Sequence, residues 1–171
     1  MNAEILDVYN SQGENTGQIK SKDDTFHENE YRLMASLWII NANGEALIQR
    51  RASTKKVCPN MWNITGGHVQ AGENSIEACI REVAEEIGLH FKPQDITLLS
   101  RSFGDGAIFD DYITVCNCKI SDFVLQPEEV SEIGWASLAE IKALFHAGAF
   151  MFSNIDKLEK VAAYINKLVD L

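Results

Sequence analysis

The sequence predicts a domain of mixed α and β structure, either an α+β fold or three α/β/α layers. Short runs of apolar residues alternate with clusters of Gly, Asn and Ser, which is typical of strands joined by turns. One amphipathic helical pattern lies in the middle of the chain, and two more lie near its end. With 171 residues, 46% of them hydrophobic, the chain can bury one sizeable core, so we expect a single domain over residues 1–171.

The first half of the chain is expected to contain mainly strands. Apolar runs bounded by turn residues predict a short first strand and then a β-hairpin. The expected elements are, in order, strand 4–8, turn 10–17, strand 33–40, hairpin turn 41–44, strand 46–50 and polar loop 52–63.

The second half is expected to contain the helices and two further strands. Helical periodicity separates these helices from the strands. The expected elements are helix 75–87, strand 96–103, turn 104–106, strand 111–119, helix 137–145 and helix 155–168.

The helix 75–87 has the clearest boundary signals. Asn74 with Glu77 three residues later is typical of a capping box, and Gly88 stands where a helix ends in a left-handed residue. At about 100° per residue, the apolar positions (Ile76, Ile80, Val83 and Ile87) fall on one side of the helix. Three glutamates, Glu82, Glu85 and Glu86, share a face nearly opposite that stripe; we call them the acidic triad.

Charge and composition exclude several classes of protein. A formal net charge of −10 disfavours binding to a nucleic-acid polymer or to an anionic membrane, although it still allows a small phosphorylated substrate through a bound cation. The first residues lack a signal-peptide pattern, and the longest apolar run is too short to span a bilayer, so we expect a cytoplasmic protein. The four cysteines lack zinc-site spacing, and free buried thiols are expected (Cys58, Cys79, Cys116 and Cys118).

The acidic triad belongs to a longer motif that carries the chemistry. The spacing reads Gly, five residues, Glu, seven residues, then Arg-Glu-apolar-x-Glu-Glu-x-Gly-apolar, from Gly67 to Leu89. Carboxylates crowded on one helix face repel each other, and a hard cation such as Mg²⁺ relieves that repulsion. Such a cation polarises a phosphoryl oxygen and acidifies a bound water, and a nearby carboxylate can accept the proton of that water.

This motif resembles the Nudix box, with every required position filled. The resemblance implies a three-layer α/β/α Nudix fold with its core at about 30–150. It also implies that Glu85, Glu86 and the carbonyl of Gly66 bind Mg²⁺ or Mn²⁺, and that Glu82 serves as a ligand or as the base. The other motif residues are expected to be structural; they are Gly67, Gly72, Glu73, Arg81 and Gly88.

Nudix enzymes often use one more acid from outside the box. The candidates are Asp110, Asp111, Glu128 and Glu129. Asp111 is preferred as a further metal ligand, because it begins an expected strand, and Glu129 as a residue at the substrate. Cations and a histidine near the motif are the remaining candidates for substrate binding; they are Arg50, Arg51, Lys55, Lys56 and His68.

Residues 4 to about 155 resemble more specifically the branch similar to isopentenyl-diphosphate isomerase. The supporting segments are 7–17, 50–56, 59–63, 66–68 and 152–153. The isomerase protonates a double bond with a cysteine, and Gly66 takes the place of that cysteine here. Cys58 lies too early to replace it, and the isomerase box is degenerate whereas this box is complete.

The favoured function is therefore metal-dependent hydrolysis of a phosphoanhydride bond in a small nucleoside-diphosphate-like substrate. Isopentenyl-diphosphate isomerase and a non-catalytic nucleotide-binding or regulatory Nudix domain are the alternatives. A homodimer is a further expectation from the family. The sequence leaves open the substrate, the attacked phosphorus and the number of metal ions.

Overall fold

A computed structural model of the chain describes residues 4–104, 106–151 and 156–169. The strands are β1 (Ile5–Tyr9), β2 (Asn15–Ser21), β3 (Arg32–Ile40), β4 (Ala46–Arg51), β5 (Trp62–Asn63), β6 (Thr65–His68), β7 (Thr97–Gly104), β8 (Ala107–Val115) and β9 (Val130–Ala136). The α-helices are α1 (Ser75–Ile87), α2 (Leu138–His146) and α3 (Asp156–Val169). Two short 3₁₀ helices are also present (Pro93–Asp95 and Ile120–Asp122).

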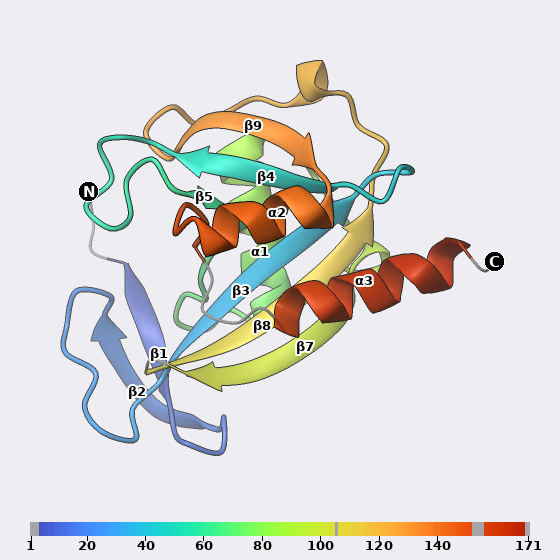
Figure 1. The fold of residues 1–171 in the computed structure, drawn as a ribbon. Helices are drawn as coiled ribbons and strands as arrows, with labels where there is room; N and C mark the ends of the chain where they lie inside the picture. The colour runs from blue at the N-terminus through green and yellow to red at the C-terminus, as the bar shows by residue number, and fades with distance from the viewer. Residues whose placement is uncertain (1–3, 105, 152–155, 170–171) are drawn as a thin grey trace.

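The helices lie on both faces of a mixed seven-stranded sheet (Figure 1). The sheet runs in the order β5-β4-β3-β8-β7, while β6 pairs with β3 and β9 pairs with β4. Among the described strands of this sheet, β3 and β8 pair in parallel and the other pairs are antiparallel. Helix α1 covers one face, and α2 and α3 cover the other, so the predicted three-layer α+β arrangement is confirmed. The hairpin of β1 and β2 forms a separate small sheet.

Strands β3 and β4 diverge, and this divergence creates the space for the site. They share one register pair, Ile40 with Ala46, next to the hairpin turn. Beyond that pair β6 lines the edge of β3 and β5 lines the edge of β4. We call the space between these two branches the fork.

Two hydrophobic clusters fill the layers on either side of the sheet. Alternate residues of β3 divide between them, because successive side chains of a strand point to opposite faces. Leu37 and Ile39 pack with α1, whereas Trp38 and Ile40 pack with α2 and α3. None of the helices in residues 4–104, 106–151 and 156–169 is long and apolar enough to cross a membrane.

Several expected boundaries differ from those observed. The turn after β1 is shorter than 10–17, since β2 begins at Asn15, and β8 spans 107–115 instead of 111–119. Strands β2, β5, β6 and β9 were not expected, because they are short or polar and form by pairing with other strands. Residue 105 of the expected turn and the 152–153 segment lie outside the described residues.

The expectation of four free thiols was wrong for one pair. Cys116 and Cys118 follow β8 and are joined in a disulfide, while Cys58 and Cys79 are free. The two bonded residues stand just past the end of β8 rather than within it, so the strand alternation assumed from sequence does not apply to them.

The packing predicts a large effect of truncating Ile87, which is fully buried between α1 and the sheet. Ile87→Ala is expected to lower the free energy of unfolding by about 2–5 kcal/mol, because it removes buried methyl groups and leaves a cavity. Urea unfolding measures this change as a lower midpoint at an unchanged slope. Leu98→Ala is the control, since Leu98 is 51% exposed on β7. Equal losses in both variants would contradict the assigned core.

Candidate metal and phosphate site

The local sequence fixes helix α1, which carries the acidic triad. The Asn74 side chain accepts a hydrogen bond from the Glu77 amide at 3.0 Å, and Glu77 Oε2 accepts one from the Asn74 amide at 3.0 Å. Gly88 ends the helix at φ 75°, in the left-handed region that glycine adopts without strain. The expected bounds and both caps are therefore confirmed, and the caps set which residues face the fork.

The three members of the triad differ in exposure, although the sequence groups them on one face of the helix. Glu85 is 55% exposed, Glu82 is mostly buried and Glu86 is only 6% exposed. Glu86 accepts a 2.7 Å hydrogen bond from Nε2 of Gln49 on β4. Gln49 Oε1 in turn accepts one from the hydroxyl of Thr65 on β6 at 3.0 Å. Gln49 therefore connects β4 to β6 across the fork and also holds Glu86 of α1.

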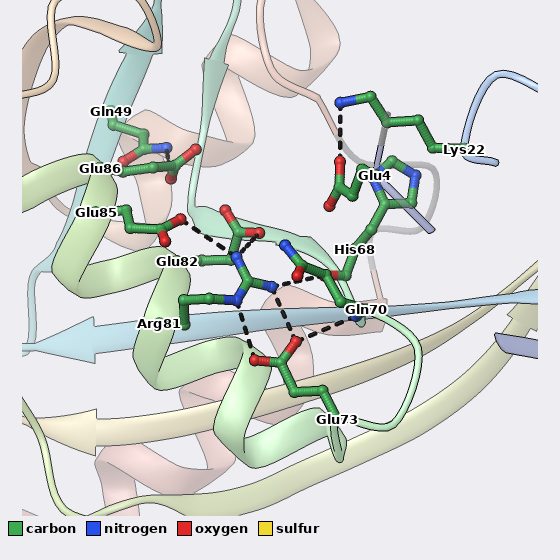
Figure 2. A network of polar contacts seen from close by, with 10 residues as sticks. All are labelled: Glu4, Lys22, Gln49, His68, Gln70, Glu73, Arg81, Glu82, Glu85 and Glu86. Atoms are coloured by element: carbon green, nitrogen blue, oxygen red, sulfur yellow. Dashed lines mark hydrogen bonds and ion pairs between the residues drawn. The ribbon is translucent and has the colours of Figure 1, made fainter. Parts of the chain in front are cut away.

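Arg81 fastens the loop of the box to the helix (Figure 2). Its Nε and Nη2 each donate to Glu73 at 3.0 Å, and Nη2 also donates to the His68 carbonyl at 3.0 Å. Its Nη1 donates to Glu82 at 2.8 Å and to Glu85 at 3.3 Å. One guanidinium thus ties β6, the loop and two members of the triad together.

The glycines of β6 let the backbone approach the triad closely. A Cβ atom at Gly67 would lie 2.4 Å from the carboxyl carbon of Glu82. Hydrogen-bonded pairs alternate along an antiparallel ladder, and the Val69 amide donates to the Leu33 carbonyl. The backbone of Gly67 therefore pairs with β3, and the carbonyls of Gly66 and His68 face away from β3. The Gly66 carbonyl is thus free to point into the fork.

Burial and mutual repulsion shape the ionisation of the site. Burial raises the pKa of Glu86 to about 7, against the hydrogen bond from Gln49, and the charges of Glu82 and Glu129 add to the increase. Burial also raises the pKa of Glu82, while Arg81 acts in the opposite direction. Burial lowers the pKa of His68, so its imidazole is neutral near pH 7. Because burial makes Glu86 costly to ionise, a cation bound beside it would stabilise its charged form strongly.

The donor set fits a hard divalent cation. Across the described ranges, no three acidic, His or Cys side chains already converge on one point. The guanidinium of Arg81 supplies positive charge to Glu82 and Glu85 instead. Carboxylate and carbonyl oxygens are nevertheless the ligands that Mg²⁺ and Mn²⁺ take, and Glu85 is exposed enough to turn toward Glu86.

Of the four acids outside the box that the sequence singles out, Glu129 is the one whose charge acts on the triad. It contributes to the raised pKa of Glu86 and binds Lys55 Nζ at 2.5 Å. Asp111 points to the opposite face of the sheet, where it is buried and bonded to Ser36 at 2.6 Å and to Lys157 of α3 at 3.0 Å. Asp110 forms a bidentate pair with Arg101, and Glu128 is exposed. The structure therefore does not bring Asp111 to the box.

The predicted basic cluster divides into residues near the triad and residues away from it. Arg51 lowers the pKa of Glu86, so its charge acts on the site. Lys55 lies beside Glu129. Arg50 bonds to the Asn60 carbonyl and pairs with Glu132, and Lys56 is exposed. Arg51 and Lys55 are thus the members of the cluster that share the site with the triad.

Sequence reasoning missed Gln49 and two residues of the N-terminal hairpin, Glu4 and Lys22. Glu4 raises the pKa of both Glu82 and His68, and it accepts a 2.8 Å bond from Lys22 (Figure 2). Gln49 and Glu4 carry no motif of their own. Strand pairing places Gln49 at the fork, and the bonds between β1 and the loop of the box place Glu4 near His68 and Glu82.

Known proteins are similar to this chain in sequence. The family model of the NUDIX domain matches residues 30–154. An uncharacterized Nudix hydrolase of Listeria monocytogenes is 32% identical over 151 residues, covering 86% of this chain and 88% of that protein. An isopentenyl-diphosphate Delta-isomerase of Escherichia coli is 29% identical over 159 residues, covering 90% of this chain and 87% of that protein.

Solved structures share the fold. A protein of Deinococcus radiodurans superposes with a TM-score of 0.76 at 23% identity, covering 94% of this chain and 98% of that chain. A MutT protein of Methanosarcina mazei superposes with a TM-score of 0.60 at 23% identity, covering 82% of this chain and 96% of that chain. Both the matched domain and the L. monocytogenes relative span most of the sequence, and the chain belongs to the Nudix family.

Proposed function

We propose that this Nudix protein hydrolyses a phosphoanhydride bond in a small nucleoside-diphosphate-like substrate, with a divalent metal ion as cofactor. The observation that carries the proposal is the burial of Glu86 at the fork, where it bonds to Gln49 and where the charge of Glu82 acts on it. A buried carboxylate whose pKa is raised to about 7 is costly for a purely structural role. A bound cation would offset the free-energy cost of ionising Glu86, and this favours cation binding at the site.

The proposed roles follow from position and chemistry. Glu85, Glu86 and the Gly66 carbonyl would hold Mg²⁺ or Mn²⁺, which when bound polarises a phosphoryl oxygen and acidifies water. Glu82 would serve as a further ligand or accept the proton of the attacking water; Arg81 holds its carboxylate in place at 2.8 Å. Arg51 and Lys55 would bind substrate phosphate, with Glu129 positioning Lys55.

Isomerisation of isopentenyl diphosphate is the second candidate, because relatives bearing that name cover 90% of this chain. The residue in the place of the isomerase cysteine is Gly66, and a Cβ atom there would lie 2.4 Å from the Ala35 carbonyl oxygen. Neither free thiol of the described residues lies on β6, and burial raises the pKa of Cys79 to about 12. These features favour hydrolysis.

Glu85→Gln and Glu86→Gln are each expected to abolish turnover while the fold is kept. Losing one charged ligand removes several kcal/mol of transition-state stabilisation, or about 10³-fold in rate. The assay measures phosphate and pyrophosphate release from nucleotide, nucleotide-sugar and isoprenoid diphosphates, with Mg²⁺ or Mn²⁺.

Glu77→Gln is the matched control, because Glu77 lies on the same helix but only caps it. Near-normal rates in Glu85→Gln or Glu86→Gln would contradict the metal assignment. Conversion of isopentenyl diphosphate to its isomer, without hydrolysis of any substrate, would replace the proposed function with the second candidate. Inactivity in both assays would favour a non-catalytic binding domain.

Glu86 is also expected to make the stability of the metal-free protein depend on pH. Its folded pKa of about 7 lies above the ordinary glutamate value of 4.5, so the folded state holds the proton more tightly. The stability it contributes is complete below about pH 4.5 and is lost as pH rises through about 7, a loss on the order of 2–3 kcal/mol. Urea unfolding in EDTA at pH 5 and pH 8 measures this loss.

Glu86→Gln should lack this loss, because Gln can still accept the hydrogen bond from Gln49 without a charge. Added Mg²⁺ should restore the stability of the unsubstituted protein at pH 8 and affect Glu86→Gln much less. Parallel pH profiles for the two proteins would show that Glu86 ionises freely in the folded state.

A further inference from the structure

The chain that follows β8 carries a cysteine pair closed into a very small ring. Cys116 and Cys118 are joined by a disulfide across a sequence separation of 2, with Asn117 between them. A disulfide restrains the unfolded chain less as its ring becomes shorter. The strand before the ring is already fixed, because β8 pairs with β3 on one side and with β7 on the other. The disulfide is therefore a weak structural link, and the pair is better suited to chemistry at sulfur.

Both cysteines of the ring stand at the edge of the core. They are half-buried against the hydrophobic cluster on the α1 face, and they alternate with exposed Val115, Asn117 and Lys119. Cys79 differs, because it is fully buried in that cluster and burial raises the pKa of its thiol to about 12. Thiol–disulfide exchange depends on access from solution. The pair is thus open to a small thiol, whereas Cys79 is not.

The ring is bonded to the turn at the closed end of the fork. The Cys116 amide donates to the Ile40 carbonyl at 2.9 Å, and the Asn117 side chain accepts the Ala42 amide at 2.8 Å. Ile40 is the residue through which β3 pairs with β4. Figure 1 shows the end of β8 and the turn between β3 and β4 at the same end of the sheet. The ring therefore lies where the two branches of the fork meet.

The chain beyond the ring runs to the helix that carries the triad. We call residues 116–129, which join β8 to β9, the β8–β9 connection. Its Val124 amide donates to the Ile87 carbonyl at 3.0 Å, and its Gln126 amide donates to the Glu86 carbonyl at 3.0 Å. The ring at one end of this connection is thus linked through the backbone to a member of the triad.

We propose that Cys116 and Cys118 form a redox-active pair that exchanges with a dithiol in solution. We further propose that this exchange sets how firmly the β8–β9 connection is held against α1. The closed ring limits the backbone of its three residues to few conformations, and reduction removes that limit. The inference does not depend on the proposed function, because no substrate takes part in the exchange.

The exchange is a two-electron reduction of the pair. A thiolate of the dithiol attacks one sulfur, the bond between Cys116 and Cys118 breaks, and the released thiolate takes up a proton. The second thiol of the reductant then loses its proton and attacks the reductant's own sulfur in the mixed disulfide. This step releases the other cysteine, which also takes up a proton, and the dithiol leaves as a cyclic disulfide.

The first test measures which cysteines react in the folded protein. Protein purified without reductant is treated with dithiothreitol and then with iodoacetamide, and peptide masses report each cysteine. We expect alkylation of Cys116 and Cys118 only after dithiothreitol, and its loss when oxidised glutathione is added in excess before trapping. Alkylation without dithiothreitol would show that the disulfide does not form. Alkylation only in urea would show that a dithiol does not reach it, and either result would overturn the proposal.

The second test follows hydrogen exchange of the β8–β9 connection by mass spectrometry. Reduction should make the amides of 119–129 exchange about 10-fold faster, because a ring of this size changes an opening equilibrium by about that factor. The double variant Cys116→Ser/Cys118→Ser should exchange at the faster rate with and without dithiothreitol. Cys58→Ser is the matched control, since Cys58 is a free cysteine whose loss should leave the response intact. Equal rates in oxidised and reduced protein would overturn the link to α1.

Discussion

Three carboxylates held together beside a β-strand cost electrostatic free energy, and much of the surrounding structure compensates for that cost. Arg81 carries the largest share, because its guanidinium contacts Glu73, Glu82, Glu85 and the His68 carbonyl at once. The same contacts fix the loop between β6 and α1. The group that neutralises the acids therefore also fixes the backbone on which the Gly66 carbonyl lies. A cation bound at the triad would take over part of the role of Arg81 at Glu85, the member most free to move.

The helix that carries the acids could be predicted from sequence, whereas their environment could not. The capping box at Asn74 and the left-handed Gly88 are local signals, and the structure has the same bounds, 75–87. The sequence places the triad as a group opposite the apolar stripe, but at about 100° per residue Glu86 lies only about 60° from Val83, at the border of that stripe. Its burial arises from Gln49 on β4, a strand whose position depends on pairing with β9. Such long-range pairing leaves no periodicity in the sequence near α1.

Asp111 shows that alternation along a strand does not by itself tell which face of the sheet a side chain occupies. A strand that begins at 107 and one that begins at 111 both place Asp111 on the same face as Ile113. Only the packing of the layers shows that α2 and α3 cover this face. There it meets Ser36 and Lys157, which satisfy its charge within the protein. Asp110, one residue earlier, faces the opposite layer and pairs with Arg101.

The segments flanking the matched domain complete the surroundings of the box from both faces of the sheet. The hairpin before residue 30 brings Glu4 and Lys22 to the loop, on the side of the triad. Helix α3, after residue 154, brings Lys157 to a cavity of about 130 Å³ that Gly66 and Gly67 also line. One strand therefore lies between this cavity and Glu82, because a Cβ atom at Gly67 would lie 2.4 Å from the Glu82 carboxyl carbon.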